Sequence, residues 1–337
     1  MNTDIFVMSH KTCDIPQDNT YRILQVGCAK NGRIDGYLWD DTGDNISERN
    51  PYYSELTGLY WLWRNWDKSD IIGVCHYRRF LLNSMGDKLS GQEIEDILKE
   101  NDIIVSNRED SGLSTKEVYE RCHYIKDLDA VCNIINDSFP DYSEALDRVL
   151  SRTKNSAGNL MITKKETMYR YCEWLFPILF EAERVIDISG YDDYHKRVYG
   201  FLSEILMNVW IEKENLSTYH CPIGITQEKS ETIELKQQLS KLIEEKKYPE
   251  AGRYFEEFYV RRPDVSLEDS DLTGELPDIY VLLHIWKNEM GHNITQNMFA
   301  EDRSCLSEKI VFYRRIEDIL NRLGAGTAVE EDVKYLL

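Results

Sequence analysis

The stretch DIIGVCHYRRFLL, residues 70–82, decides the fold class of this chain. From Ile71 to Cys75 it is apolar and rich in β-branched residues, which is typical of a buried strand, and it then turns abruptly basic. In an open α/β sheet, ligands bind beyond the carboxyl ends of the strands. The stretch therefore predicts a buried strand that carries a histidine, a tyrosine and two arginines to a binding edge.

Helical and strand patterns alternate on both sides of this strand. Upstream, residues 50–66 have apolar side chains at helical spacing, with Asn50 as the N-cap and Pro51 at the first helical position. Downstream, SGQEIEDILKEN (90–101) is typical of an amphipathic helix and DIIVSN (102–107) of a strand. The alternation predicts an α/β domain with a mostly parallel sheet flanked by helices. Further strands are expected in IFVMSH (5–10), YRILQVG (21–27) and NLMITKK (159–165).

Long helical patterns follow the last of these strands. The helix expected over residues 166–186 contains Pro177, which predicts a kink or a division. The helix expected over residues 199–215 is apolar on most faces, so we expect it to be buried. Beyond this point the chain is rich in Glu, Lys and Gln, and we predict a domain of residues 1–225 followed by a helical C-terminal region of residues 226–337.

Composition and charge exclude several classes of function. The 60 acidic against 40 basic side chains give a formal charge of -20, which repels nucleic acid, so we expect no nucleic-acid partner. No stretch approaches the roughly 18 apolar residues of a spanning helix, and the start lacks a secretory pattern, so we expect a cytoplasmic protein without a transmembrane segment. The eight cysteines show no ligand spacing, which argues against a zinc site.

Polar groups gather at three places in the predicted domain. His10 and Lys11 follow the first strand, DDTGDN (40–45) precedes a helix, and HYRR (76–79) ends the central strand. An arginine in HYRR could hold a phosphate through two parallel hydrogen bonds, or it could only pair with an acidic residue. The acidic stretch could form a turn, chelate Mg²⁺ or Mn²⁺, or accept hydrogen bonds from sugar hydroxyls. Chelation is the less favoured of these, because the nearby cations can neutralise a diphosphate instead.

Glu204 is a carboxylate inside the apolar helix GFLSEIL (200–206). A carboxylate in such a place is either paired with a cation, for which Arg197 is the nearest choice, or raised in pKa by burial so that it acts as a general base. His123 lies on another expected helix, and taken alone it is a structural residue.

Four ordered motifs, spread from about Ile5 to about Trp210, make the chain resemble a bacterial family, DUF4422, found among capsule, exopolysaccharide and lipopolysaccharide gene products. The motifs are DDTGDNISERNPYYSELTGLYWLW, DKSDIIGVCHYRRF, GNLMITKKETMYRYCEWLFPILFE and RVYGFLSEIL. Members of the family are taken to be glycosyltransferases, so the resemblance implies a GT-A-like, Rossmann-type fold. It also implies a UDP-sugar donor, with galactofuranose or galactose favoured, and a polysaccharide or lipid-linked glycan acceptor.

The resemblance further implies roles for single residues. Many GT-A enzymes carry an Asp-x-Asp metal motif where this chain has His76, Tyr77 and Arg78, which puts metal dependence in doubt and leaves Mn²⁺ or Mg²⁺ open. The implied base of an inverting reaction is Glu204, with Asp44 as the alternative. The implied donor contacts are His10, Lys11, Asp41, Asn45, His76, Tyr77, Arg78 and Arg79, and the acceptor contacts are His123, Tyr199 and Trp174.

Two other functions stay open at this point. The protein could be a non-catalytic carbohydrate-binding or scaffold protein of a polysaccharide-synthesis complex, or a nucleotide-sugar hydrolase or phosphorylase. If the acceptor is lipid-linked, peripheral contact with the inner face of the plasma membrane would need a local basic face or a partner, because the chain as a whole is acidic.

Overall fold

A mostly parallel sheet with the strand order β10-β6-β9-β4-β1-β2-β3 forms the centre of the first part of the chain. The structure is a computed structural model, and it describes residues 1–13, 19–262, 265, 270–292 and 305–336. The strands of this path are β1 (Thr3–Ser9), β2 (Tyr21–Gln25), β3 (Leu38–Trp39), β4 (Ile71–His76), β6 (Ile103–Ser106), β9 (Met161–Lys164) and β10 (Thr218–Cys221).

Strand directions confirm the predicted mixed α/β fold. β1 pairs in parallel with β2 and β4, β2 with β3, and β6 with β10. β9 is the exception, because it runs antiparallel to both β4 and β6. The carboxyl ends of β1 and β4 therefore lie side by side, and the amino end of β9 reaches the same edge.

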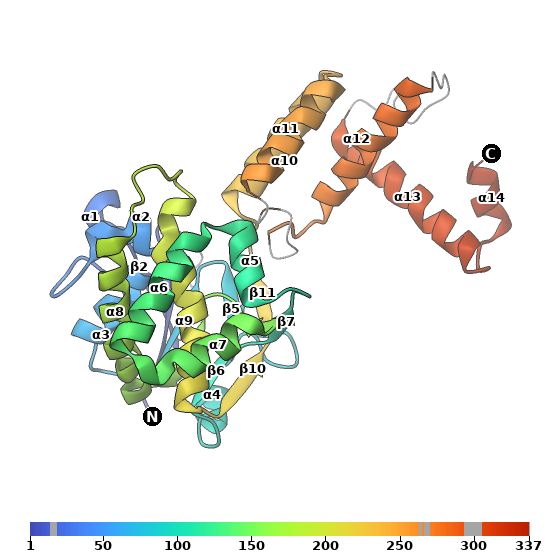
Figure 1. The fold of residues 1–337 in the computed structure, drawn as a ribbon. Coiled ribbons are helices and arrows are strands. Elements are labelled where there is room, and N and C mark those ends of the chain that lie inside the picture. The colour runs from blue at the N-terminus through green and yellow to red at the C-terminus, as the bar shows by residue number, and fades with distance from the viewer. Residues whose placement is uncertain (14–18, 263–264, 266–269, 293–304, 337) are drawn as a thin grey trace. The chain divides into compact units, whose positions relative to one another are not determined.

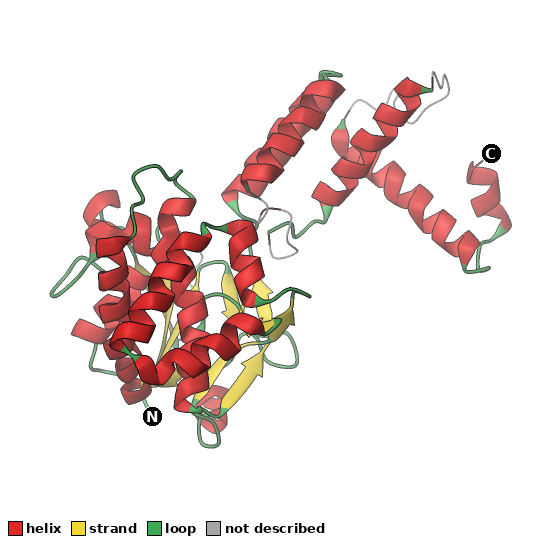
Figure 2. Ribbon diagram, viewed as in Figure 1, coloured by secondary structure: helices red, strands yellow, loops and turns green. Residues whose placement is uncertain are grey.

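Helices cover this sheet (Figures 1 and 2). Along β1, Phe6 and Met8 pack into one hydrophobic cluster while Ile5 and Val7 pack into another, as the alternation of a strand requires. The first cluster holds the apolar faces of α3 and α6 to α9, and the second holds that of α4. The helices are α1 (Cys28–Asn31), α2 (Asn50–Tyr53), α3 (Leu56–Asn65), α4 (Gly91–Ile97), α5 (Thr115–Cys122), α6 (Ile125–Ser138), α7 (Ser143–Ser151), α8 (Lys165–Val185) and α9 (Val198–Glu214).

α3 approaches the sheet closely, because Gly58 faces β1. A Cβ atom at this position would come within 2.5 Å of the sulfur of Met8. The close approach places the amino end of α3 next to the carboxyl end of β4, where Glu55 lies 3.8 Å from His76.

Two predicted elements differ from those in the structure. The helix expected over residues 50–66 is divided into α2 and α3, because Ser54 adopts a φ of 50° and a ψ of −130°, which no helix accommodates. The basic end of the predicted strand 70–82 turns back, so that β5 (Arg79–Leu81) pairs antiparallel with β4 and with β11 (Ile223–Ile225).

α8 continues through Pro177 as one helix and is not divided there. A separate pair of short strands is formed by β7 (Arg108–Asp110) and β8 (Lys154–Ser156).

The chain divides into two compact units, Met1–Thr226 and Gln227–Leu337. The second unit is helical in its described residues and has a hydrophobic cluster of its own, built around residues such as Leu239, Ile279 and Ile310. No helix in the described part of the chain is both long and apolar enough to cross a membrane. The helices of this unit are α10 (Ser230–Glu244), α11 (Tyr248–Arg261), α12 (Glu275–Gly291), α13 (Leu306–Gly324) and α14 (Glu330–Leu336).

Candidate functional site

Charged and polar side chains meet beyond the carboxyl end of β4, in what we call the edge cluster. They come from segments far apart in the sequence: the break before α3, the end of β4, the start of β5, the turn before β9, and α9 with the residue before it. Charged groups that are buried close to one another have shifted pKa values, and groups with shifted pKa values are concentrated at functional sites. The members of the edge cluster are Glu55, His76, Arg79, Asn159, Arg197 and Glu204.

The break at Ser54 is what brings Glu55 into this cluster. The strained backbone of Ser54 is held by Asn50, whose side-chain amide donates to the Ser54 carbonyl at 2.7 Å. The hydroxyl of Ser54 accepts a hydrogen bond from Arg197 Nε at 3.1 Å. In the continuous helix predicted from the sequence, Glu55 would lie in the middle of the helix. The break at Ser54 instead turns its carboxylate toward His76.

The turn before β9 connects Glu55 to α9. The side-chain amide of Asn159 donates to Glu55 Oε1 at 2.5 Å and to the carbonyl of Gly200 at 3.2 Å, and its oxygen accepts from Ser203 Oγ at 3.0 Å. The preceding backbone amide, that of Gly158, donates to Glu204 Oε2 at 3.0 Å. Neighbouring residues of one turn thus orient both carboxylates of the edge cluster.

The pKa values of the two carboxyl groups, Glu204 and Glu55, are shifted in opposite directions. Burial raises the pKa of Glu204 above its ordinary value, and the negative charge of Glu55 adds to the effect, while Arg79 and Arg197 oppose it. Burial would also raise the pKa of Glu55, but His76, the hydrogen bond from Asn159 and the charge of Arg197 outweigh it, so that the pKa of Glu55 is lowered. Such a divergence is typical of acid–base sites, and Glu204 is the better proton acceptor of the two near neutral pH.

His76 is neutral at physiological pH in this arrangement. Burial lowers its pKa to about 4, and Arg79, Arg78 and Arg197 contribute in the same direction, while Glu55 opposes them. Its Nε2 atom is buried and has no hydrogen-bond partner among the described residues. The Glu55 carboxylate is 3.8 Å away. A neutral imidazole can donate or accept one hydrogen bond without adding a further positive charge beside the arginines.

The shifted pKa of His76 makes a prediction about stability. The unfolded chain binds a proton at His76 below about pH 6.5, whereas the folded chain does so only below about pH 4, so stability decreases as the pH falls through this window. His76→Asn should remove up to about 3 kcal/mol of this decrease. The measurement is urea unfolding at a series of pH values from 7 down to 4.

The matched control for this measurement is His220→Asn, which replaces a half-buried histidine on β10. If wild type and His76→Asn lose stability equally between these pH values, His76 titrates normally and the described burial does not act on it.

A second group of side chains surrounds Tyr77 at the same edge. The ring centroids of His10 and Tyr77 are 5.5 Å apart. Lys11 Nζ lies 4.9 Å from the centroid of the Tyr77 ring, and the Arg78 guanidinium lies 5.7 Å from it. His10 and Lys11 are exposed and follow β1, which is the parallel neighbour of β4. The structure therefore brings together His10, Lys11, Tyr77 and Arg78, and it places His76 and Arg79 in the adjoining edge cluster.

The acidic stretch is engaged elsewhere. Asp41 accepts both of its hydrogen bonds from Arg33 Nε, at 3.1 and 3.0 Å, and Asp44 pairs with Arg64 at 2.7 Å. Asn45 closes a turn on the carbonyl of Gly43 at 3.0 Å. Arg64 lies at the other end of α3 from Glu55, about 13 Å along the helix axis. Asp44 is thus not brought beside Glu204. Asp41, Asp44 and Asn45 belong to a turn, which is the first of the three interpretations of this stretch.

The predicted acceptor residues fall into two kinds. Tyr199 is 1% exposed and packs on Tyr53 in the core, and Trp174 is 6% exposed and stacks on Tyr142. Neither ring has a free face, so their predicted stacking against a sugar is corrected to a packing role. His123 differs, because it is half-buried at the end of α5.

The sequence analysis missed Glu55 and Asn159. Glu55 lies within a strong helical pattern, so no local signal marks it, and only the break at Ser54 gives it a special position. Asn159 is the first residue of the strand expected over NLMITKK (159–165), and a polar residue at the start of a buried strand is the one signal that could have found it. Arg197 entered only as a partner for Glu204.

The described residues do not fit a metal centre at this edge. Among them, no group of three or more His, Cys, Asp or Glu side chains is placed to hold a metal ion. The end of β4 carries His76, Tyr77 and Arg78, and two of these positions hold a neutral imidazole and a guanidinium.

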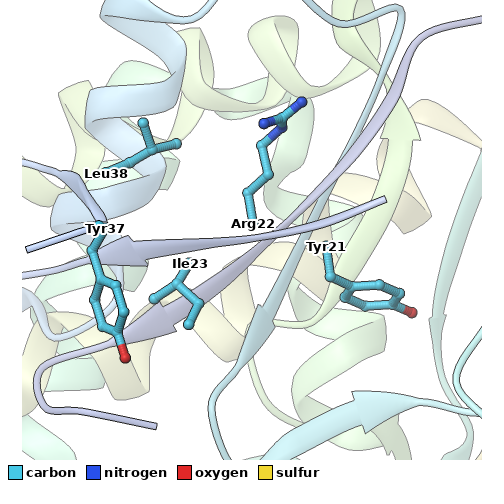
Figure 3. A pocket seen from close by; sticks show the side chains of 6 residues that line it. Tyr21, Arg22, Ile23, Tyr37 and Leu38 are labelled. Atoms are coloured by element: carbon cyan, nitrogen blue, oxygen red, sulfur yellow. The ribbon is translucent and has the colours of Figure 1, made fainter. Parts of the chain in front are cut away.

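A pocket of about 270 Å³ lies beside the start of β2 (Figure 3). Its wall comes from the amino halves of β2 and β3, whereas the edge cluster lies beyond the carboxyl end of β4. The pocket is therefore separate from the candidate site. Its lining residues are Tyr21, Arg22, Ile23, Gly36, Tyr37 and Leu38.

Comparisons with known proteins bear on this architecture. The model of a protein family described as a domain of unknown function, DUF4422, matches residues 4–215. Among solved structures, the apo structure of the bifunctional glycosyltransferase WbbM is similar, with a TM-score of 0.64 and 28% identity. The match covers 67% of this chain and 46% of that chain, so the chain spans less than half the length of WbbM. A search of curated proteins found no match.

Proposed function

The chain belongs to the DUF4422 family, and from this premise we propose that it is a glycosyltransferase. It transfers a glycosyl group from a nucleotide sugar to a hydroxyl of a growing polysaccharide or a lipid-linked glycan. The likeness to WbbM, a bifunctional glycosyltransferase, supports the reaction class. We assign the reaction to a domain of residues 1–225, because the edge cluster and the Tyr77 group lie there, and we assign its setting to the cytoplasm.

The edge cluster is the observation that carries this proposal. It offers a carboxylate of raised pKa, Glu204, within the influence of Arg79 and Arg197 at the carboxyl edge of an α/β sheet. Glycosyl transfer needs a base for the acceptor hydroxyl and positive charge for the departing diphosphate, and both are present within one site.

The proposed reaction is a single displacement that inverts the anomeric carbon. Glu204 accepts the proton of the acceptor hydroxyl, and the oxygen then forms its bond to the anomeric carbon on the face opposite the nucleotide. The bond from that carbon to the diphosphate oxygen breaks, and the nucleoside diphosphate leaves with the electron pair. Lys11, Arg78 and Arg79 stabilise the charge that develops on it, and the two arginines need little reorganisation because they are half-buried and already in place.

We favour a UDP-linked galactose isomer, in the furanose or pyranose form, as the donor. Support comes only from the resemblance of the motifs to family members associated with such sugars. His10 and Tyr77 are the residues that we assign to the nucleotide, since they adjoin the cations at the ends of β1 and β4. Asp41, Asp44 and Asn45 are given no part in the reaction.

The experiment that tests the function measures UDP released from UDP-galactofuranose and UDP-galactose, with and without added glycosides. A glycosyltransferase releases UDP slowly from its donor and faster with an acceptor. A scaffold or carbohydrate-binding protein releases none, and a hydrolase or phosphorylase gains nothing from an added glycoside. Either of these last two results rejects the proposal.

Metal independence is a prediction of the same proposal. Because the arginines and Lys11 supply the positive charge and the described residues offer no metal cluster, turnover should persist within about twofold when EDTA is added. The measurement compares initial rates of UDP release in EDTA, Mg²⁺ and Mn²⁺. A loss of more than about tenfold in EDTA that Mn²⁺ restores would show that a metal supplies this charge.

A further inference from the structure

α9 joins the edge cluster to a group of aromatic rings. Phe201 and Glu204 are three residues apart on this helix, so their side chains lie on the same side about one turn apart. The guanidinium of Arg197 lies 5.4 Å from the centroid of Phe201 and also acts on Glu204. The rings therefore begin within one helical turn of the proposed base.

The rings form a continuous series around the junction of α5 and α6. His123 stacks on Phe201 with the centroids 4.1 Å apart and 24° between the planes, and Tyr194 lies 5.0 Å from Phe201. Tyr194 is 5.2 Å from His195, which is 4.8 Å from Tyr124. We call these rings, with Tyr191, the aromatic platform.

Two carboxylates hold the platform in place. Asp192 accepts hydrogen bonds from the backbone amides of Tyr194 and His195 and from His195 Nδ1, at 2.9, 2.9 and 2.8 Å. Asp127, on α6, accepts from the hydroxyl of Tyr191 at 2.8 Å. The Tyr191 hydroxyl thus connects the loop before α9 to α6, and Asp192 fixes the turn at Tyr194 and His195, which lowers the entropy that a bound ligand would have to remove.

The outer member of the platform remains accessible. Tyr124 is 40% exposed, although its ring contacts Tyr191 at 4.4 Å and His195 at 4.8 Å. Tyr199 and Trp174, whose rings serve the core, are 1% and 6% exposed. Tyr124 by contrast presents an amphipathic ring at the surface, next to the half-buried His123 and His195.

Resting on the proposed function, we infer that the aromatic platform binds the sugar ring of the acceptor. A base can act only on a hydroxyl within hydrogen-bond reach, so the acceptor must lie beside Glu204. The platform approaches Glu204 at Phe201, which lies about one turn away on α9. Its amphipathic rings suit a sugar, which is apolar on the faces and polar around the edge, and Lys126 Nζ, 5.7 Å from the Tyr124 ring, adds a donor for the hydroxyls.

The test varies the acceptor at saturating UDP-galactofuranose or UDP-galactose, whichever the wild type consumes. The acceptor probes are the octyl glycosides of galactose, glucose and mannose. Tyr124→Ala should raise the acceptor KM about fivefold or more, because the stacking face is lost, while the donor KM stays within twofold. Tyr124→Phe keeps the face and should stay within twofold of wild type for both substrates.

The matched control is Tyr219→Ala on β10, which removes a tyrosine of similar exposure, 43%, outside the platform and should change neither KM. The inference is overturned if Tyr124→Ala accepts every probe with the wild-type KM. Failure of the proposed function looks different, because the wild type then either consumes no UDP-sugar or consumes it at a rate that no glycoside raises, and the inference falls with it.

Discussion

Glu204→Gln is expected to lower the rate of sugar transfer by about 100- to 10,000-fold, the range over which a positioned general base contributes. Glutamine keeps the size of the side chain and can still accept the hydrogen bond from the Gly158 amide, but it cannot take a proton. The measurement is kcat for UDP release in the presence of an acceptor glycoside. Binding of UDP, measured by calorimetry, should stay within about threefold of wild type, because the base faces the acceptor.

Stability separates this catalytic loss from damage to the fold. Burial disfavours the ionised carboxylate of Glu204, so above its ordinary pKa of 4.5 the charge makes the folded state less stable. Removing the charge should therefore leave the melting temperature unchanged or raise it. Glu214→Gln, near the other end of α9, is the matched control and should retain wild-type turnover. Wild-type turnover by Glu204→Gln would remove Glu204 from the role of base.

The pH dependence of turnover by the wild type is a second test of Glu204 as the base. The base works only when it is deprotonated, so turnover should fall as the pH falls through the raised pKa of Glu204. The decline should therefore begin above the ordinary value of 4.5 for a glutamate. Glu55, whose pKa is lowered, would give a decline below that value.

Arg78→Ala is expected to raise the Kd for UDP by about 10- to 100-fold. The guanidinium lies over the ring of Tyr77, just beyond the carboxyl end of β4, and Lys11 contacts the same ring, so Arg78 can hold a diphosphate there with charge-assisted hydrogen bonds. Calorimetric titration of UDP into the variant measures the effect. Raising the salt concentration should weaken binding to the wild type more than binding to the variant, since one charge fewer is screened.

Arg64→Ala provides the control for this titration. Arg64 is a surface arginine paired with Asp44 at the far end of α3, so its loss should leave the Kd for UDP unchanged. An unchanged Kd for Arg78→Ala as well would assign Arg78 to structural pairing, the other reading that the sequence leaves open. A weaker Kd for both variants would mean that the acidic stretch takes part after all.

Much of the fold could be predicted from local patterns. The buried run Ile71–Cys75, the alternating helices and strands, and the change of composition near residue 225 each depend on neighbouring residues only. The structure confirms the α/β sheet that they predict. The exceptions are local as well: a serine in a strained conformation divides one helix, and a turn at Tyr77 folds the basic end of a strand back on itself.

The candidate site was less accessible to the same method. The sequence by itself determined that cations follow β1 and β4, because strand ends are readable from hydrophobic periodicity and parallel neighbours share an edge. It also marked Glu204 as unusual, because a carboxylate in an apolar helix needs a reason. Only the tertiary structure decided which polar groups meet. Glu55 and Asn159, 104 residues apart, contact each other through a strained turn and the approach of α3 to the sheet, and the local helix and strand patterns that contain them do not show that they meet.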